Sequence, residues 1–102
     1  MIQYGSDRVT ELRFEQLTAR VERRDAQWVD VEARFRSEAE RLYPELERLS
    51  ALIICTTGGQ IAQIVPQDGG LDCEYQFTAG EKAQLEAYIM STAMQARIAE
   101  AQ

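Results

Sequence analysis

The sequence predicts an α+β fold: an N-terminal heptad-patterned helix, kinked or broken near Pro44, then a small antiparallel three-stranded sheet and a C-terminal helix. Three observations predict this order. A seven-residue repeat runs through the first half, residues after Ser50 are rich in β-branched and aromatic types, and a capping motif begins at Thr78. The chain has 102 residues, of which 45% are hydrophobic and 27% charged, so we expect one small folded domain over residues 1–102.

The repeat consists of a polar residue, usually arginine, followed by an apolar one, and it returns every seven residues from Arg13 to Leu49. Seven residues are almost two helical turns, so its members would share one stripe of a helix, whereas in a strand they would alternate between faces. We therefore expect a helix over about 8–50 whose apolar stripe contacts another chain, with Trp28 and Phe35 as anchors. The predicted interface comprises Phe14, Leu17, Val21, Trp28, Val31, Phe35, Leu42 and Leu49.

A strand is the alternative for part of this segment. Between Val29 and Phe35, apolar residues alternate with charged ones, and "RRDAQ" before them could form a hairpin turn. The many Glu, Arg, Ala, Gln and Leu residues and the absence of Gly or Pro between Ser6 and Tyr43 favour the helix. The helix is thus the preferred prediction for the first half.

Pro44 interrupts that helix, because proline lacks a backbone donor and costs about 3 kcal/mol inside a helix. We expect a kink there or a separate helix over 44–50, and "SEAE", Ser37 to Glu40, matches a capping box that could mark a new start. A continuous helix over most of 8–50 would be about 60 Å long, more than a compact domain of this size needs. It should fold back near residues 23–25 or pack against a second copy.

The second half predicts short strands near 51–56, 60–65 and 71–77, separated by glycine pairs. Such short links imply antiparallel pairing. Thr57-Gly58-Gly59 is interpreted as a hairpin turn, because glycine supplies the positive φ that these turns need.

The C-terminal helix is predicted over about 79–101. "TAGE", Thr78 to Glu81, fits a capping box, and apolar residues such as Leu85 and Ile89 then recur at helical spacing. Met90 and Met94 are expected to fill the core.

"TGGQIA", Thr57 to Ala62, resembles the "TGGTIA" signature of the bacterial L-asparaginase family, in which the threonine at the position of Thr57 is the nucleophile. The resemblance covers six residues. Gln60 replaces the second threonine, no second threonine–aspartate motif follows, and the chain is too short for that family's fold. The turn interpretation is therefore kept.

Other catalytic chemistry has little support in the sequence. The chain has no histidine, which excludes Ser–His–Asp and Cys–His arrangements, and neither common phosphate-loop pattern occurs. Cys55 and Cys73 give neither a disulfide framework nor a zinc spacing, although a pairing between them stays open. We expect no enzymatic activity, catalytic residue, metal or cofactor. A reactive thiol beside a pocket with Cys73 and Tyr75 is the enzymatic alternative.

The net charge of −6 disfavours nonspecific binding to nucleic acid or to anionic membranes. Neither a signal peptide nor a membrane-spanning run is visible at the sequence level, so a cytoplasmic protein is expected. We predict a protein–protein interaction module of the assembly, adaptor or chaperone type that binds first its own copy, as a homodimer or higher oligomer. The alternative is an acidic inhibitor that binds a basic protein through Asp68, Asp72, Glu74, Glu81 and Glu86.

Overall fold

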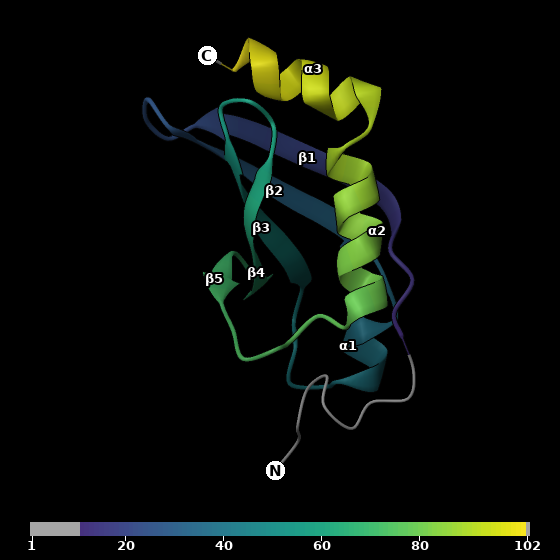
Figure 1. The fold of residues 1–102 in the computed structure, drawn as a ribbon. Helices are drawn as coiled ribbons and strands as arrows, with labels where there is room; N and C mark the ends of the chain where they lie inside the picture. Colours follow the sequence, from purple (N-terminus) through teal and green to yellow (C-terminus); the bar gives the residue numbers. More distant parts are fainter. Residues whose placement is uncertain (1–10, 102) are drawn as a thin grey trace.

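A computed structural model describes residues 11–101 of the chain. Within these residues, five antiparallel strands form one sheet in the order β1-β2-β3-β4-β5, so each strand pairs with its neighbour in sequence (Figure 1). The elements are β1 (Glu15–Arg23), β2 (Trp28–Arg36), α1 (Ala39–Leu42), β3 (Leu49–Thr56), β4 (Ile61–Asp68), β5 (Leu71–Asp72), α2 (Ala79–Ile89) and α3 (Thr92–Glu100). The fold is α+β as predicted, but the sheet has five strands instead of three.

The predicted N-terminal helix is wrong. Residues 15–36 form the hairpin of β1 and β2, in which Val21 lies opposite Val31, and residues 8–10 of the predicted helix lie outside the described residues. The Asp25 carboxylate accepts hydrogen bonds from the backbone N–H groups of Gln27 and Trp28, at 2.8 and 2.9 Å, and so stabilises the turn. The alternation from Val29 to Phe35, together with "RRDAQ", was therefore the correct signal.

The helix expected around Pro44 is also wrong. The chain forms only the four-residue α1, and Pro44 follows it in the connection to β3. A short helix does begin within "SEAE", but its N-cap is Glu38 and not Ser37, and no side-chain capping bond forms, so the predicted capping box is wrong. The Ser37 hydroxyl only accepts a hydrogen bond from the Ala39 N–H at 3.2 Å. Leu49, assigned to the helical stripe, is the first residue of β3.

The predicted turn at Thr57–Gly59 is confirmed. It joins β3 to β4, and Gly59 has a φ of +90°, which L-residues rarely adopt. The Gly59 carbonyl accepts a hydrogen bond of 3.0 Å from the Gln95 side chain of α3, and this bond holds the turn against the C-terminal helix.

The C-terminal helical region begins as predicted and then divides. The Thr78 hydroxyl accepts a hydrogen bond from the Glu81 N–H, and the Glu81 side chain accepts one from the Thr78 N–H, which completes the capping box. The single helix expected over 79–101 is two helices, because Ser91 caps a new one by accepting a hydrogen bond from the Met94 N–H. The chain thereby changes direction between α2 and α3 (Figure 1).

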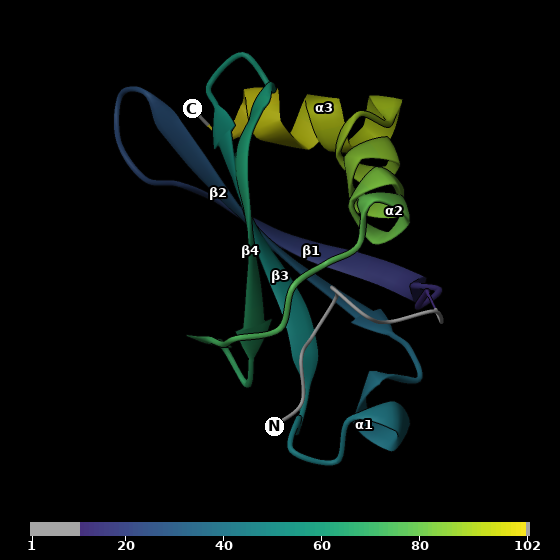
Figure 2. The same cartoon turned by 60° about the horizontal axis from the view of Figure 1, so that its bottom comes forward.

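Both long helices lie on the same side of the sheet (Figure 2). Residues that alternate along β2 and β3 point toward them and are fully buried, as are Leu85 and Ile89 of α2 and Ile98 of α3. The sheet residues in this core include Val29, Val31, Ala33, Ala51, Ile53 and Cys55. Among the described residues, no helix covers the opposite face of the sheet, so that face is where a binding surface can lie.

Candidate functional site

The uncovered side of the sheet, here called the open face, collects the residues that alternate with the core. Strand register places them in cross-strand rows, such as Arg20, Glu32, Leu52 and Val65. None of them is fully buried. The open face comprises Thr18, Arg20 and Glu22 of β1; Trp28, Asp30, Glu32 and Arg34 of β2; Ser50, Leu52, Ile54 and Thr56 of β3; and Gln63, Val65 and Gln67 of β4.

An apolar stripe occupies the β3 and β4 half of the open face. It consists of Leu52, Ile54 and Val65, with Trp28 of β2 at one end, and all four side chains are partly exposed. Exposed faces of antiparallel sheets usually carry polar residues, so a run of apolar ones without a covering element is an unusual feature. Ser50, Thr56, Gln63 and Gln67 surround it, and none of these is charged.

Charged side chains occupy the β1 and β2 half, and they are balanced in sign. Arg20 lies 3.1 Å from the Glu22 carboxylate, and Arg24 reaches from the hairpin loop to Asp30 at 2.9 Å. Glu32 lies directly opposite Arg20 in the strand register. The exposed pair between Arg20 and Glu22 contributes little to stability, but the balance leaves this face without the negative charge that the whole chain carries.

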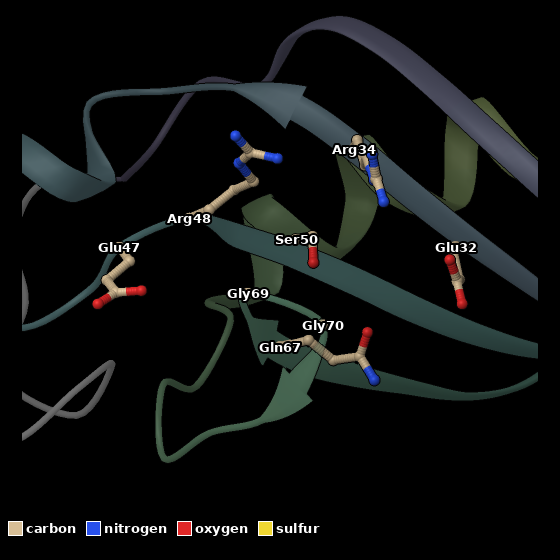
Figure 3. A pocket seen from close by; sticks show the side chains of 8 residues that line it. All are labelled: Glu32, Arg34, Glu47, Arg48, Ser50, Gln67, Gly69 and Gly70. Carbon is tan, nitrogen blue, oxygen red and sulfur yellow. The ribbon is translucent and has the colours of Figure 1, made fainter.

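A pocket of about 290 Å³ lies at one end of the open face, where β2 and β3 meet the turn between β4 and β5. Figure 3 shows Ser50 between the side chains of Arg34 and Arg48, with Glu32 and Glu47 at opposite ends. Gln67 and the two glycines of the turn complete the lining. The arrangement can offer several hydrogen-bond donors to one small ligand.

Most residues of the predicted interface lie in or against the core. Phe14, Val31 and Leu49 are buried, and Leu17, Val21 and Phe35 pack partly buried against the same cluster. Phe35 stacks on Phe14 with ring centroids 4.0 Å apart. Leu42 of α1 is 38% exposed, and Trp28 is the one member of the predicted set that lies on the open face. The shared helical stripe does not exist, and an interface role for these residues stays untested.

The predicted acidic surface is divided by the fold. Asp72, Glu74 and Glu86 are exposed, and Asp68 is partly exposed. The Asp68 carboxylate accepts hydrogen bonds from the backbone N–H groups of Glu47 and Arg48, at 2.9 and 2.7 Å.

Glu81, the fifth acidic residue of that prediction, is fully buried and has a structural role. Its carboxylate accepts hydrogen bonds from the Leu12 N–H at 2.7 Å and from the Tyr75 hydroxyl at 2.9 Å. Because Leu12 precedes β1, this contact joins the start of the chain's described part to α2, and Glu81 is not available to an external partner.

The two cysteines are free thiols. Burial, with a smaller contribution from Asp30, raises the pKa of the Cys55 thiol to about 11. Burial and the nearby carboxylates of Asp68 and Asp72 raise the pKa of Cys73. Both shifts lower the thiolate fraction at neutral pH, which disfavours the nucleophilic thiol considered from the sequence.

The described residues contain no group of three or more His, Cys, Asp or Glu side chains placed to hold a metal ion. In the same part of the chain, no helix has the length and apolar character required to cross a membrane. Comparison with models of protein families, with characterised proteins and with solved structures finds no match.

The residues of the open face were missed in the sequence because their role depends on strand register. Leu52 and Ile54 belong to the run "ALIICT", in which all the apolar residues are of types suited to a core. The signal that identifies β2 as a strand, the alternation from Val29 to Phe35, would also have placed Asp30, Glu32 and Arg34 on one common face.

Proposed function

We propose that the protein is a non-enzymatic protein-binding module that associates with a second copy of itself through the open face. The observation that carries the proposal is the apolar stripe of Leu52, Ile54, Val65 and Trp28 on a sheet face that no described helix covers. Burying apolar side chains between two sheets is the ordinary way in which such faces pack.

The balanced charge of the open face supports a second copy of the chain as the partner that binds there. The chain has a net charge of −6, which would oppose self-association between arbitrary surfaces. On the open face, however, Arg20, Arg34 and the inward-reaching Arg24 balance Glu22, Asp30 and Glu32. A two-fold axis between β3 and β4 would stack the stripe on itself and leave these charges at the rim, where they cost little desolvation.

The size of the face predicts a reversible dimer. Four strands about 4.8 Å apart and about 26 Å long give about 500 Å² for each copy. Two such surfaces bury about 1,000 Å², near the lower limit for a specific interface. The association should therefore depend on concentration, as expected for an adaptor or chaperone that exchanges partners.

Light scattering on a sizing column over a range of protein concentrations tests the proposal with the variant Leu52→Lys. The new lysine lies opposite Glu32, so the sheet should accept it as a cross-strand ion pair. The native chain should approach twice its 11.6 kDa mass as concentration rises, whereas the variant should remain at 11.6 kDa.

Leu71→Lys is the matched control, because Leu71 of β5 is 76% exposed and lies outside the open face. This variant should self-associate like the native chain. A native chain that remains monomeric at high concentration, or equal loss of association in both variants, would overturn the proposal. In that case, salt-sensitive binding to a basic protein through the exposed acids becomes the function to test.

A further inference from the structure

We infer that the pocket formed by Arg34, Arg48, Ser50 and Gln67 binds a small oxyanion, a phosphate or a carboxylate. The inference does not depend on self-association, because the pocket is complete within one chain. Strand register places Ser50 and Gln67 of the pocket one row beyond Leu52 and Val65, at the end of the apolar stripe.

Strand register brings the polar groups of this pocket together. Arg34 of β2 lies directly opposite Ser50 of β3, and Ser50 lies directly opposite Gln67 of β4. The guanidinium, hydroxyl and side-chain amide are therefore neighbours across three strands, at a separation of about 5 Å per strand.

Arg48 completes the pocket from a fixed backbone position just before β3. Its N–H donates to the Asp68 carboxylate at 2.7 Å, and its carbonyl accepts a hydrogen bond from the Gly69 N–H at 2.9 Å. The turn below it has positive φ at Gly69 and Gly70, and a Cβ on either would meet no atom within 4 Å. The absence of side chains there keeps this side of the pocket accessible to a ligand.

The two guanidinium groups of the pocket have unused donors. Within residues 11–101, Arg34 and Arg48 form no side-chain hydrogen bond or ion pair, in contrast to Arg20, Arg24 and Arg41, which pair with carboxylates. Each guanidinium presents five N–H donors in a planar fork that matches the spacing of carboxylate or phosphate oxygens.

The two acidic side chains that line the pocket lie too far from its centre to prevent an anion from binding there. Figure 3 shows Glu32 and Glu47 at opposite ends, away from the space around Ser50. A volume of about 290 Å³ corresponds to about ten water molecules, so a phosphate ion or a small organic acid fits.

The test is a titration of the ¹⁵N-labelled full-length chain with inorganic phosphate, with acetate and with chloride at constant ionic strength. It is followed by NMR at a protein concentration at which light scattering gives the monomer mass, so that self-association cannot contribute. Saturable shifts of the Ser50, Gly69 and Gly70 amides are expected with phosphate or acetate, and the stronger of these two identifies the preferred oxyanion. Chloride should give no saturable shift.

Variants of the pocket arginines supply the control. Arg34→Gln and Arg48→Gln should each weaken binding at least about tenfold, since a charge-assisted hydrogen bond is lost. Arg20→Gln, on the same face but outside the pocket lining, should retain affinity within about twofold. The inference is overturned if chloride produces the same shifts as both oxyanions, if neither oxyanion saturates, or if Arg20→Gln weakens binding as much as the pocket variants do.

Discussion

Replacing Glu81 by alanine should lower the free energy of unfolding by about 3 kcal/mol. The buried carboxylate accepts hydrogen bonds from the Leu12 N–H, the Tyr75 hydroxyl and the Thr78 N–H, at 2.7, 2.9 and 3.1 Å. Each hydrogen bond to a charged group contributes about 1.5–3 kcal/mol, and the first two donors are buried. Removing a buried carboxylate also removes its desolvation cost, which offsets part of the sum.

Urea denaturation followed by circular dichroism measures this loss by linear extrapolation. A small domain is stable by only about 5–15 kcal/mol, so a loss of about 3 kcal/mol gives a large shift of the midpoint. Protein concentration should be kept low, because dimer formation would add to the apparent stability.

Glu86→Ala is the matched control, since Glu86 lies on the same helix and is exposed. It should change the free energy of unfolding by less than about 0.5 kcal/mol. A loss below about 1 kcal/mol for Glu81→Ala, or equal losses for the two variants, would refute the structural role assigned to Glu81.

Three further outcomes follow from the structure. Gly59→Ala should cost at least about 1 kcal/mol in thermal or urea unfolding, because φ is +90° and a Cβ would overlap the Gln95 amide, whereas Gly58→Ala should be nearly neutral. The raised pKa of the Cys55 thiol, about 11 against an ordinary 9.0, stabilises the fold below pH 9, and this contribution should disappear as pH rises toward 11. Native protein should therefore lose about 2–3 kcal/mol more than Cys55→Ala over that range. Phe35→Glu should abolish the folded circular dichroism spectrum instead of giving a folded monomer, because the partly buried ring stacks on the buried Phe14 and packs against the core.

Local signals in the second half predicted the turns and the start of α2, but the strand expected over 71–77 is wrong beyond the two-residue β5, because residues 73–77 are not strand. The glycine pairs at Gly58–Gly59 and Gly69–Gly70 lie in turns, and Thr78 caps a helix, because positive φ and side-chain capping are requirements that few residues meet. The break at Ser91 was not predicted, although serine is a favoured N-cap, because the apolar pattern continues through it.

The first half was predicted incorrectly because helix propensity and spacing were weighed above alternation. Val21 and Phe35 pack against the core, whereas Trp28, seven residues from each of them, lies on the open face. Side chains in a strand alternate between the two faces of the sheet, so residues seven positions apart lie on opposite faces. The members of the seven-residue repeat therefore do not form one surface. Propensity is a weak signal, and pairing of β2 with β3 outweighs it.

The open face could not be identified from the sequence for the same reason. Leu52 and Ile53 are adjacent and similar, yet Ile53 is fully buried and Leu52 is on the open face. Only the register with β2 and β4 and the position of the helices decide which of them faces a partner.

The most direct test of the open face as an interface is an isotope-filtered NOE measurement on a mixture of ¹³C-labelled and unlabelled chains. The proposal predicts intermolecular contacts from the methyl groups of Leu52, Ile54 and Val65, and their loss in Leu52→Lys. Intermolecular contacts confined to another surface, such as the edge of β1 or the acidic residues around Asp72, would contradict the proposal. The absence of all intermolecular contacts at concentrations well above those used for sizing would also contradict it.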